Sequence, residues 1–171
     1  SRGGFIAIFE PLPTLRLLLD WLNNRANLEA GTPAPPLKLD RMERICSLLG
    51  SPEKDFRSIH VTGTNGKGST VRIASELLVE AGFSVGTYTS PDLEQVNERI
   101  AYNGQPVSDS ELADLLAELR QVEAILDFHP SRFELLTAAA LSAFSARAVD
   151  FAVVEVGLGG RFDSTNVVTA D

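Results

Sequence analysis

The sequence predicts an α/β protein with helices packed on a mainly parallel central sheet, and three observations indicate this fold class. An apolar segment at 57–62 leads into a glycine-rich loop and then into a helical pattern. A second segment, 151–156, is apolar throughout except for Glu155, as expected of a strand buried on both faces. Another glycine-rich loop follows it at 157–166. Two such loops, each after an apolar strand, predict a functional site at the carboxyl edge of a sheet.

Residues 1–35 are predicted to form a lead-in helix and a linker before the main domain, residues 36–171. Thr14 can cap a helix that runs to about Asn27, in which one apolar stripe is formed by Leu15, Leu18, Leu19 and Leu22. The stretch 33–36 contains three prolines, which fit neither a helix nor a central strand. We therefore expect an extended connector there.

The main domain is predicted to begin with a short helix and then to alternate strands and helices. An Asp-x-x-Glu pattern at Asp40 has the form of a capping box, and Gly50 supplies the helix stop. A strand at 57–62, the first glycine-rich loop, a helix ending at Gly82 and a second strand at 83–88 follow. These elements predict a strand–loop–helix–strand unit of the nucleotide-binding type.

The second half of the chain carries further local signals. Pro91 ends the second strand in a polar loop, and Asn103-Gly104 is the strongest hairpin signal in the chain. A Ser-x-x-Glu capping pattern at Ser108 opens a helix to about Leu126. An alanine-rich helix over 134–147 then leads into the last apolar strand.

Composition and charge narrow the function classes. The 171 residues can bury one core, and a net charge of −8 argues against broad binding to nucleic acids or anionic membranes. An anionic ligand must then be held locally, by Lys67, Arg99, Arg132 or Arg161. The single cysteine, Cys46, is expected in the core. No targeting or membrane-spanning pattern is found, so a cytoplasmic protein is predicted.

The first glycine-rich loop, TGTNGKGST, can cradle a polyphosphate. Glycines let backbone N–H groups approach phosphate oxygens, Lys67 supplies a mobile cation, and the helix N-terminus adds its positive dipole end. The spacing departs from the usual G-x-x-x-x-G-K-[ST] pattern. Gly63 and Gly66 are only three apart, and Gly68 separates the lysine from the hydroxyl of Ser69. Nucleotide binding is favoured, with a glycine-rich structural turn as the alternative.

Glu155 is the one charged residue in an otherwise apolar strand. An unpaired buried carboxylate costs several kcal/mol, so this side chain is expected to be paired, protonated or bound to a metal. Nucleotide-binding enzymes keep an acidic magnesium partner at strand ends beside the phosphate loop. The pattern therefore favours a magnesium ligand, and a buried salt bridge is the alternative.

With these residues in view, the chain resembles the folylpolyglutamate synthase/dihydrofolate synthase family of the Mur-ligase superfamily. The resemblance implies a P-loop NTPase-like three-layer fold, the N-terminal part of the ATP-binding domain, with the C-terminal glutamate-ligase domain absent. Family members are usually monomeric and about twice this length or more, so the chain alone is expected not to turn over. The matching segments, in family order, are HVTGTNGKGST at 60–70, YTSPDL at 88–93, NERI at 97–100, SRFELLTAAAL at 131–141 and VVEVGLGGRFDSTNVV at 153–168.

The resemblance implies an ATP-dependent amide ligase with Mg²⁺ as cofactor. ATP phosphorylates the carboxylate of dihydropteroate or the γ-carboxyl of a folate, and the amino group of L-glutamate displaces phosphate from the acyl phosphate. The chemistry agrees with the predicted site, because joining two polyanions needs cations and N–H donors. The alternatives are another Mur-type amino-acid ligase, a truncated nucleotide-binding module without catalysis and, more weakly, a small-molecule kinase.

The resemblance also implies roles for individual residues. The catalytic pair is Lys67, which reaches the transferred phosphoryl group, and Glu155. Magnesium ligands are Ser90 and Glu155. ATP is expected to contact Asn65, Gly66, Lys67, Gly68 and Ser69. The segments that hold the pterin substrate in bifunctional members correspond to Ser131, Arg132, Phe133, Glu134, Phe162, Asp163 and Ser164.

Some of these residues have simpler explanations, which remain open at this point. Phe133 suits core packing, and Glu134 suits a helix start, where an acid is favoured by the dipole. Asp163 can form an ion pair with Arg161. Asp92 stands where many family members carry histidine, which leaves the shape of the serine loop open.

Overall fold

The central sheet has five strands in the order β1-β5-β2-β3-β4. The structure is a computed structural model and describes residues 13–27, 39–92, 94–157 and 164–168. β5 pairs in parallel with β1 on one side and β2 on the other, whereas β3 and β4 continue the sheet antiparallel. The strands are β1 (Arg57–Val61), β2 (Val85–Tyr88), β3 (Ile100–Tyr102), β4 (Gln105–Pro106) and β5 (Phe151–Glu155).

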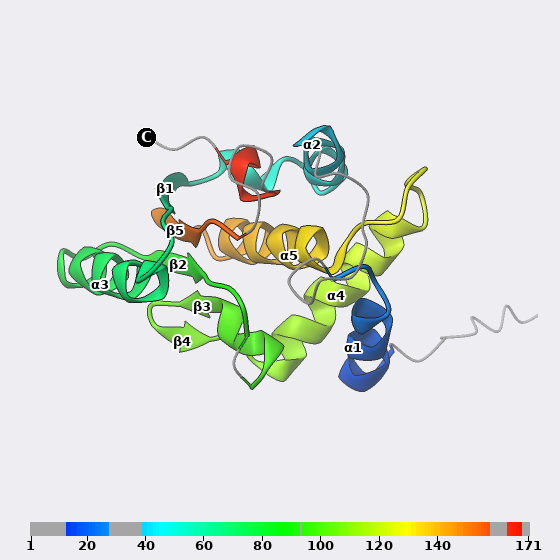
Figure 1. Cartoon of the computed structure of the whole chain (residues 1–171), viewed down its shortest axis with the longest axis horizontal. Helices are drawn as coiled ribbons and strands as arrows, with labels where there is room; N and C mark the ends of the chain where they lie inside the picture. The colour runs from blue at the N-terminus through cyan, green and yellow to red at the C-terminus, as the bar shows by residue number, and fades with distance from the viewer. Residues whose placement is uncertain (1–12, 28–38, 93, 158–163, 169–171) are drawn as a thin grey trace, which may run out of the picture.

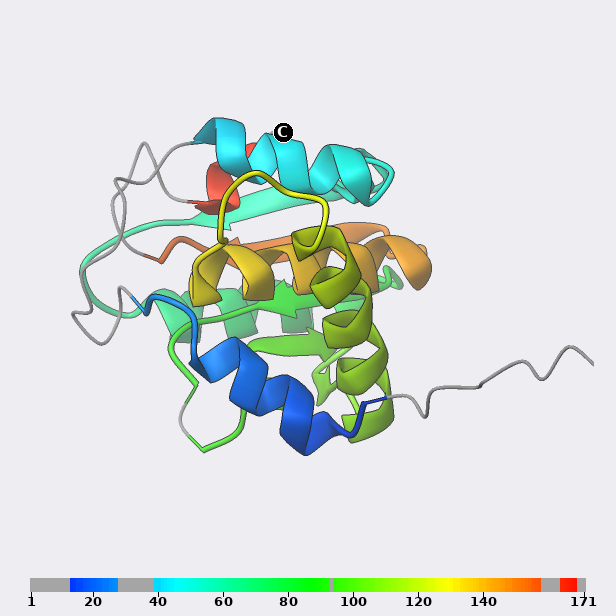
Figure 2. The same cartoon turned by 90° about the vertical axis from the view of Figure 1, so that its right-hand side faces the viewer.

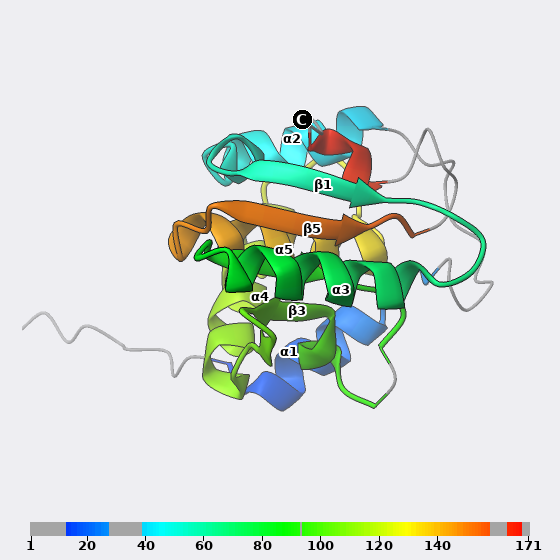
Figure 3. The same ribbon diagram turned by 90° about the vertical axis from the view of Figure 1, so that its left-hand side faces the viewer.

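Helices cover both faces of this sheet. α3 lies on one face, and the other helices lie on the opposite side of the sheet, as Figures 1 and 3 show from two directions. The helices are α1 (Leu15–Asn23), α2 (Leu39–Leu48), α3 (Lys67–Glu80), α4 (Asp109–Glu123) and α5 (Arg132–Ala146), with short 3₁₀ turns η2 (Pro52–Lys54), η3 (Val96–Arg99) and η5 (Ser164–Val167). The predicted α/β fold with a mainly parallel central sheet is confirmed.

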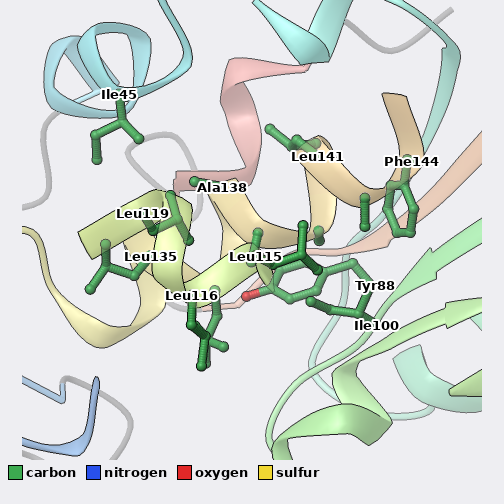
Figure 4. Close-up of a cluster of buried hydrophobic side chains, with 14 of the residues drawn as sticks. Ile45, Tyr88, Ile100, Leu115, Leu116, Leu119, Leu135, Ala138, Leu141 and Phe144 are labelled. Carbon is green, nitrogen blue, oxygen red and sulfur yellow. The ribbon is translucent and has the colours of Figure 1, made fainter. Parts of the chain in front are cut away.

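Strand alternation divides the core into two clusters. Val153 of β5 packs in the smaller cluster under α3, while Ala152 and Val154 point into the larger cluster under α5. Gly86 of β2 allows this close packing, because a Cβ placed there would lie 2.3 Å from Phe144 of α5. Figure 4 shows the larger cluster, which draws on α2, α4, α5 and two strands through Ile45, Tyr88, Ile100, Leu115, Leu116, Leu119, Leu135, Ala138, Leu141 and Phe144.

Figure 2 shows α1 and α4 side by side, and the first helix is shorter than predicted. The Thr14 cap is confirmed, since its hydroxyl accepts from the Leu17 N–H at 3.5 Å. The helix ends at Asn23 because the carbonyl of Ala26 accepts a hydrogen bond from the Arg132 N–H, which draws the chain towards α5. The predicted connector at 33–36 lies outside the described residues.

Three other predicted boundaries also shift, in each case because of a local hydrogen bond. Asp40 is not the cap of α2 but lies in its first turn, where it accepts from the next N–H. β2 begins at Val85, because the Phe83 N–H still bonds to the carbonyl of Leu78 in α3. α5 begins two residues early because Ser131 caps it.

The remaining local signals are confirmed. Gly50 and Gly82 both have positive φ after a helix. The Asn103-Gly104 turn joins β3 to β4, and both residues have positive φ, as a type I′ hairpin requires. Cys46 is buried in the core. In the described ranges, no helix is long and apolar enough to cross a membrane.

Candidate functional site

Three loops meet at one edge of the sheet, where β1, β5 and β2 end. The register pairs Val61 with Glu155 and Val154 with Tyr88, so the residues that follow these strands are neighbours. The arrowheads of β1 and β5 point to the same edge in Figure 3. The first glycine-rich loop, residues 156–157 after β5 and the serine loop, defined as residues 89–92, therefore leave the sheet at the same edge, while residues 158–163 of the second glycine-rich loop lie outside the described residues.

The first glycine-rich loop ends at the N-terminus of α3. Gly63 and Gly66 both have positive φ, and Gly66 is the N-cap residue of the helix in a left-handed conformation. The first N–H groups of a helix lack intrahelical partners, so this terminus offers free donors to an anion. Residues 68–70 are exposed, and no atom lies within 4 Å of a Cβ built at Gly66 or Gly68. The loop is therefore open to a ligand.

Lys67, the first residue of α3, connects the first glycine-rich loop to the residue that follows β5. Its Nζ donates a hydrogen bond of 3.1 Å to the carbonyl of Val156, directly after β5. An ammonium has three N–H donors, so most of its capacity remains for phosphate oxygens. This position suits a cation that reaches a polyphosphate held by the loop.

Glu155 and Ser90 lie together at the end of β5. The Glu155 side chain is buried, and its Oε2 accepts a hydrogen bond of 3.2 Å from the Ser90 N–H. Among the described residues, no ion pair involves Glu155, so its predicted salt-bridge alternative finds no support there. A carboxylate and a hydroxyl supply the hard oxygen donors that Mg²⁺ prefers.

The number of protein ligands also fits magnesium. The described residues contain no group of three or more His, Cys, Asp or Glu side chains that could hold a metal. Mg²⁺ is commonly bound by one or two side chains, with water and substrate phosphates completing its shell. Ser90 and Glu155 can therefore hold a magnesium ion that is shared with a nucleotide.

The serine loop is tied down on its far side. The Thr89 N–H donates to the carbonyl of Arg99 at 3.0 Å, and Oδ1 of Asp92 accepts from the guanidinium groups of Arg99 and Arg132. Burial raises the pKa of the Asp92 carboxyl. The hydrogen bond and charge of Arg99, together with the charge of Arg132, outweigh burial, so the pKa lies below its usual value. Asp92 is thus an ionised anchor for the loop.

The predicted substrate segment 131–134 starts α5 and is largely engaged within the protein. Ser131 and Glu134 form a reciprocal capping box, and Arg41 pairs with Glu134 through two nitrogens at 3.0 Å. Phe133 is buried with its ring 6.1 Å from that of Tyr88. These contacts account for both structural alternatives, and the substrate role of the segment stays a prediction.

The rest of the predicted substrate set is described only in part. Ser164 is buried at the start of η5, while Phe162 and Asp163 lie outside the described residues, as does Arg161. A cavity of about 450 Å³ borders Asp92 and Arg132, and a second of about 460 Å³ runs from Gly68 and Thr89 along α3. Both have the size of small-molecule sites.

Sequence reasoning missed two arginines of this region. Arg41 pairs with a residue 93 positions away, and no local pattern signals that partner. Arg99 was expected only as a possible anion ligand, yet its side chain is 1% exposed and bound to Asp92. The sequence does show an arginine in the NERI segment and one aspartate, Asp92, in the nearby polar loop. These two residues alone do not predict that they pair.

The sheet order, the glycine-rich loop before α3 and the acidic strand end define an α/β protein with a candidate ligand site at the carboxyl edge of its sheet. No family model matches the chain. It is 49% identical over 135 residues to the dihydrofolate synthase/folylpolyglutamate synthase of Bacillus subtilis, which covers 76% of this chain and 31% of that protein.

Solved structures agree with this relative. A Mycobacterium tuberculosis folylpolyglutamate synthase complexed with ADP and AMPPCP matches 91% of this chain and 34% of its own, with 37% identity and a TM-score of 0.82. A complex of FPGS with AMPPCP and folate matches 92% of this chain and 38% of its own, with 36% identity and a TM-score of 0.85. The chain is therefore related to the dihydrofolate synthase/folylpolyglutamate synthase family, and it spans about a third of the length of these relatives.

Proposed function

We propose that this chain is the nucleotide-binding part of an ATP-dependent amide ligase that adds L-glutamate to dihydropteroate, to the γ-carboxyl of a folate, or to both. The observation that carries the proposal is the convergence of Lys67, Ser90 and Glu155 on one sheet edge, in a chain similar to an FPGS bound to AMPPCP and folate. The wider assignment is the Mur-ligase superfamily, with a P-loop as its nucleotide site.

In this proposal the first glycine-rich loop binds the ATP phosphates. The contacts come from the backbone of Gly66 and Gly68, the amide of Asn65, the hydroxyl of Ser69 and the ammonium of Lys67. The support is the open loop at the N-terminus of α3 and the unused donors of Lys67. Lys67 then neutralises charge on the phosphoryl group that is transferred.

Ser90 and Glu155 would hold the magnesium ion. When bound, Mg²⁺ supplies charge neutralisation on the phosphates and a fixed orientation for them. The chain's own contribution is the position of the two oxygen donors. The hydrogen bond from the Ser90 N–H to Oε2 of Glu155 holds the serine loop beside the end of β5.

The proposed reaction has two balanced steps. A carboxylate oxygen of the acceptor attacks the γ-phosphorus, the bond from γ-phosphorus to the bridging oxygen breaks, and ADP leaves with that electron pair. The amine of L-glutamate then attacks the acyl carbon, phosphate departs with the carbon–oxygen electron pair, and the nitrogen loses a proton. Lys67 and the α3 N-terminus stabilise negative charge in the first step.

The acceptor is proposed to bind near the start of α5. Residues 131–134 and 162–164 are the expected contacts, and the cavity of about 450 Å³ beside Asp92 and Arg132 borders the first of these segments. Bifunctional activity is favoured because both segments match pterin-binding positions. We also expect a cytoplasmic monomer that binds neither nucleic acid nor membrane, given its net charge of −8.

The test uses the intact protein that contains this chain. It is incubated with Mg-ATP and L-glutamate, with dihydropteroate or tetrahydrofolate offered separately, and products are identified by mass. Dihydrofolate and glutamate-extended folate together establish the bifunctional ligase, and one product alone narrows the assignment. ADP with neither product retains the ATP site and rejects the folate assignment in favour of another amino-acid ligase. Nucleotide binding without ADP formation favours a non-catalytic module.

A further inference from the structure

The carboxylate of Asp92 accepts hydrogen bonds from two arginines. Its Oδ1 accepts from Nε of Arg99 at 2.7 Å, and it lies 3.3 and 3.4 Å from the two terminal nitrogens of Arg132. The terminal nitrogen of Arg99 is also 2.7 Å away. One carboxylate oxygen therefore joins two guanidinium groups from different parts of the chain.

Burial makes these contacts strong. The Arg99 and Arg132 side chains are 1% and 8% exposed, while that of Asp92 is 24% exposed. Guanidinium groups removed from water need a nearby anion, because breaking a buried ion pair leaves an uncompensated charge. Loss of the Asp92 contacts would weaken the compensation of these two buried charges, so Asp92 anchors the end of the serine loop.

The same loop carries Ser90, two residues before Asp92. The Thr89 N–H is bonded to the Arg99 carbonyl at 3.0 Å and the Ser90 N–H to Glu155 at 3.2 Å, so contacts hold the loop at residues 89, 90 and 92. A change at Asp92 will therefore be felt at Ser90.

Arg132 connects this loop to two further elements. Its Nε donates to Oδ1 of Asn23 at 3.2 Å, and its backbone N–H donates to the carbonyl of Ala26 after α1. Arg132 also begins α5, inside the segment 131–134 proposed to bind the acceptor. Arg132 thus joins that segment to Asp92 of the serine loop by direct contact.

We propose that Asp92 and Arg132 are positioning residues whose ion pair holds Ser90 against Glu155 and couples these two metal ligands to the acceptor segment. The inference rests on the proposed function in assigning Ser90 and Glu155 to magnesium. Neither residue is expected to touch the nucleotide.

The test compares Asp92→Asn, Arg132→Gln and the double variant with wild type in the 171-residue chain. Glu111→Gln is the matched control, because it breaks another arginine–carboxylate pair, with Arg147, at the far end of α5. The first readout is hydrogen exchange of the Ser90 amide. The second is the gain in AMPPCP affinity that Mg²⁺ produces, measured by calorimetry with and without the metal.

In both single variants we expect the Ser90 amide to exchange about tenfold faster and most of the Mg²⁺-dependent gain in AMPPCP affinity to be lost. The double variant should show effects little larger than those of either single variant, because the two residues act as one pair. AMPPCP affinity without Mg²⁺ should stay near the wild-type value, and Glu111→Gln should change neither readout. Arg132→Lys, which keeps the charge, should restore part of both effects.

Folded variants with wild-type exchange at Ser90 and a wild-type magnesium gain would overturn the proposal. If Asp92→Asn does not fold, the Arg132 variants decide, since they remove only one arm of the pair. If wild type itself binds no AMPPCP, the proposed function fails, and the exchange readout alone still decides whether the pair positions Ser90.

Discussion

Lys67 is the residue on which nucleotide binding most depends. We predict that Lys67→Met lowers affinity for AMPPCP about 10- to 100-fold, because charge-assisted hydrogen bonds to phosphate are lost. Stability should change little, since the residue makes one bond to the Val156 carbonyl. Calorimetry measures the affinity, with Lys54→Met on an exposed turn as the control. Equal losses in the two variants would show that only net charge matters.

Glu155 is expected to act through its charge and not through its hydrogen bond. Glu155→Gln keeps an oxygen that can accept from the Ser90 N–H but removes the anion. We predict that the Mg²⁺-dependent gain in AMPPCP affinity disappears while affinity without metal is retained or improved, because a buried negative charge near the phosphates is gone. A magnesium gain that survives this substitution contradicts the assignment of Glu155.

His60 makes folding stability depend on pH. Burial lowers the pKa of its imidazole, opposed by a hydrogen bond to the backbone of Thr165. A group whose pKa is lowered on folding stabilises the protein above its unfolded pKa, here about 6.5, and that contribution is lost as pH falls through the folded pKa. We predict that the unfolding free energy falls from about pH 7.5 to about pH 5.5.

Urea unfolding at the two pH values measures this fall. His60→Gln should flatten it. A slope that is the same in His60→Gln and wild type would assign the pH dependence to other groups.

At the scale of elements, the contact between β2 and α5 leaves no spare volume. We predict that Gly86→Ala destabilises the protein by about 1–3 kcal/mol, because its Cβ would lie 2.3 Å from Cδ1 of Phe144. Denaturant unfolding measures the loss. Adding Phe144→Leu should recover part of it, since the ring is the obstacle. Additive losses in the double variant would place the strain elsewhere.

Local sequence signals predicted caps and turns better than boundaries that depend on distant contacts. The Thr14 and Ser108 caps and the Asn103-Gly104 turn are confirmed because each depends on neighbouring residues alone. The end of α1 was misplaced, since a hydrogen bond from Arg132 to Ala26 decides it. Contacts over about a hundred residues leave no trace in local periodicity.

Local sequence signals also predicted part of the candidate site. Lys67 and Glu155 lie in recognisable strand–loop contexts, and parallel pairing then brings them to one edge. The partners that hold the loops did not follow, because Arg41–Glu134 and Arg132–Asp92 join segments that are distant in sequence. Substrate contacts at 162–163 lie outside the described residues.

At the scale of the whole molecule, the chain spans about a third of its relatives. We predict that the 171 residues bind Mg-AMPPCP but form no glutamylated product, because about two thirds of the length of these relatives has no counterpart in the matched region. The measurement is product mass after incubation with Mg-ATP, L-glutamate and dihydropteroate or tetrahydrofolate. Sustained product formation, absent from the Lys67→Met variant, would refute the prediction.

The central claim is that the edge formed by β1, β5 and β2 is a magnesium–nucleotide site. Amide chemical shifts of the ¹⁵N-labelled chain, titrated with AMPPCP and Mg²⁺, test it most directly because weak binding is also detected. We expect shifts concentrated at residues 63–70, at Ser90 and at Glu155–Val156, with the Ser90 and Glu155 changes requiring the metal. Shifts that are absent from these residues at saturating ligand, or that gather at another surface, would contradict it.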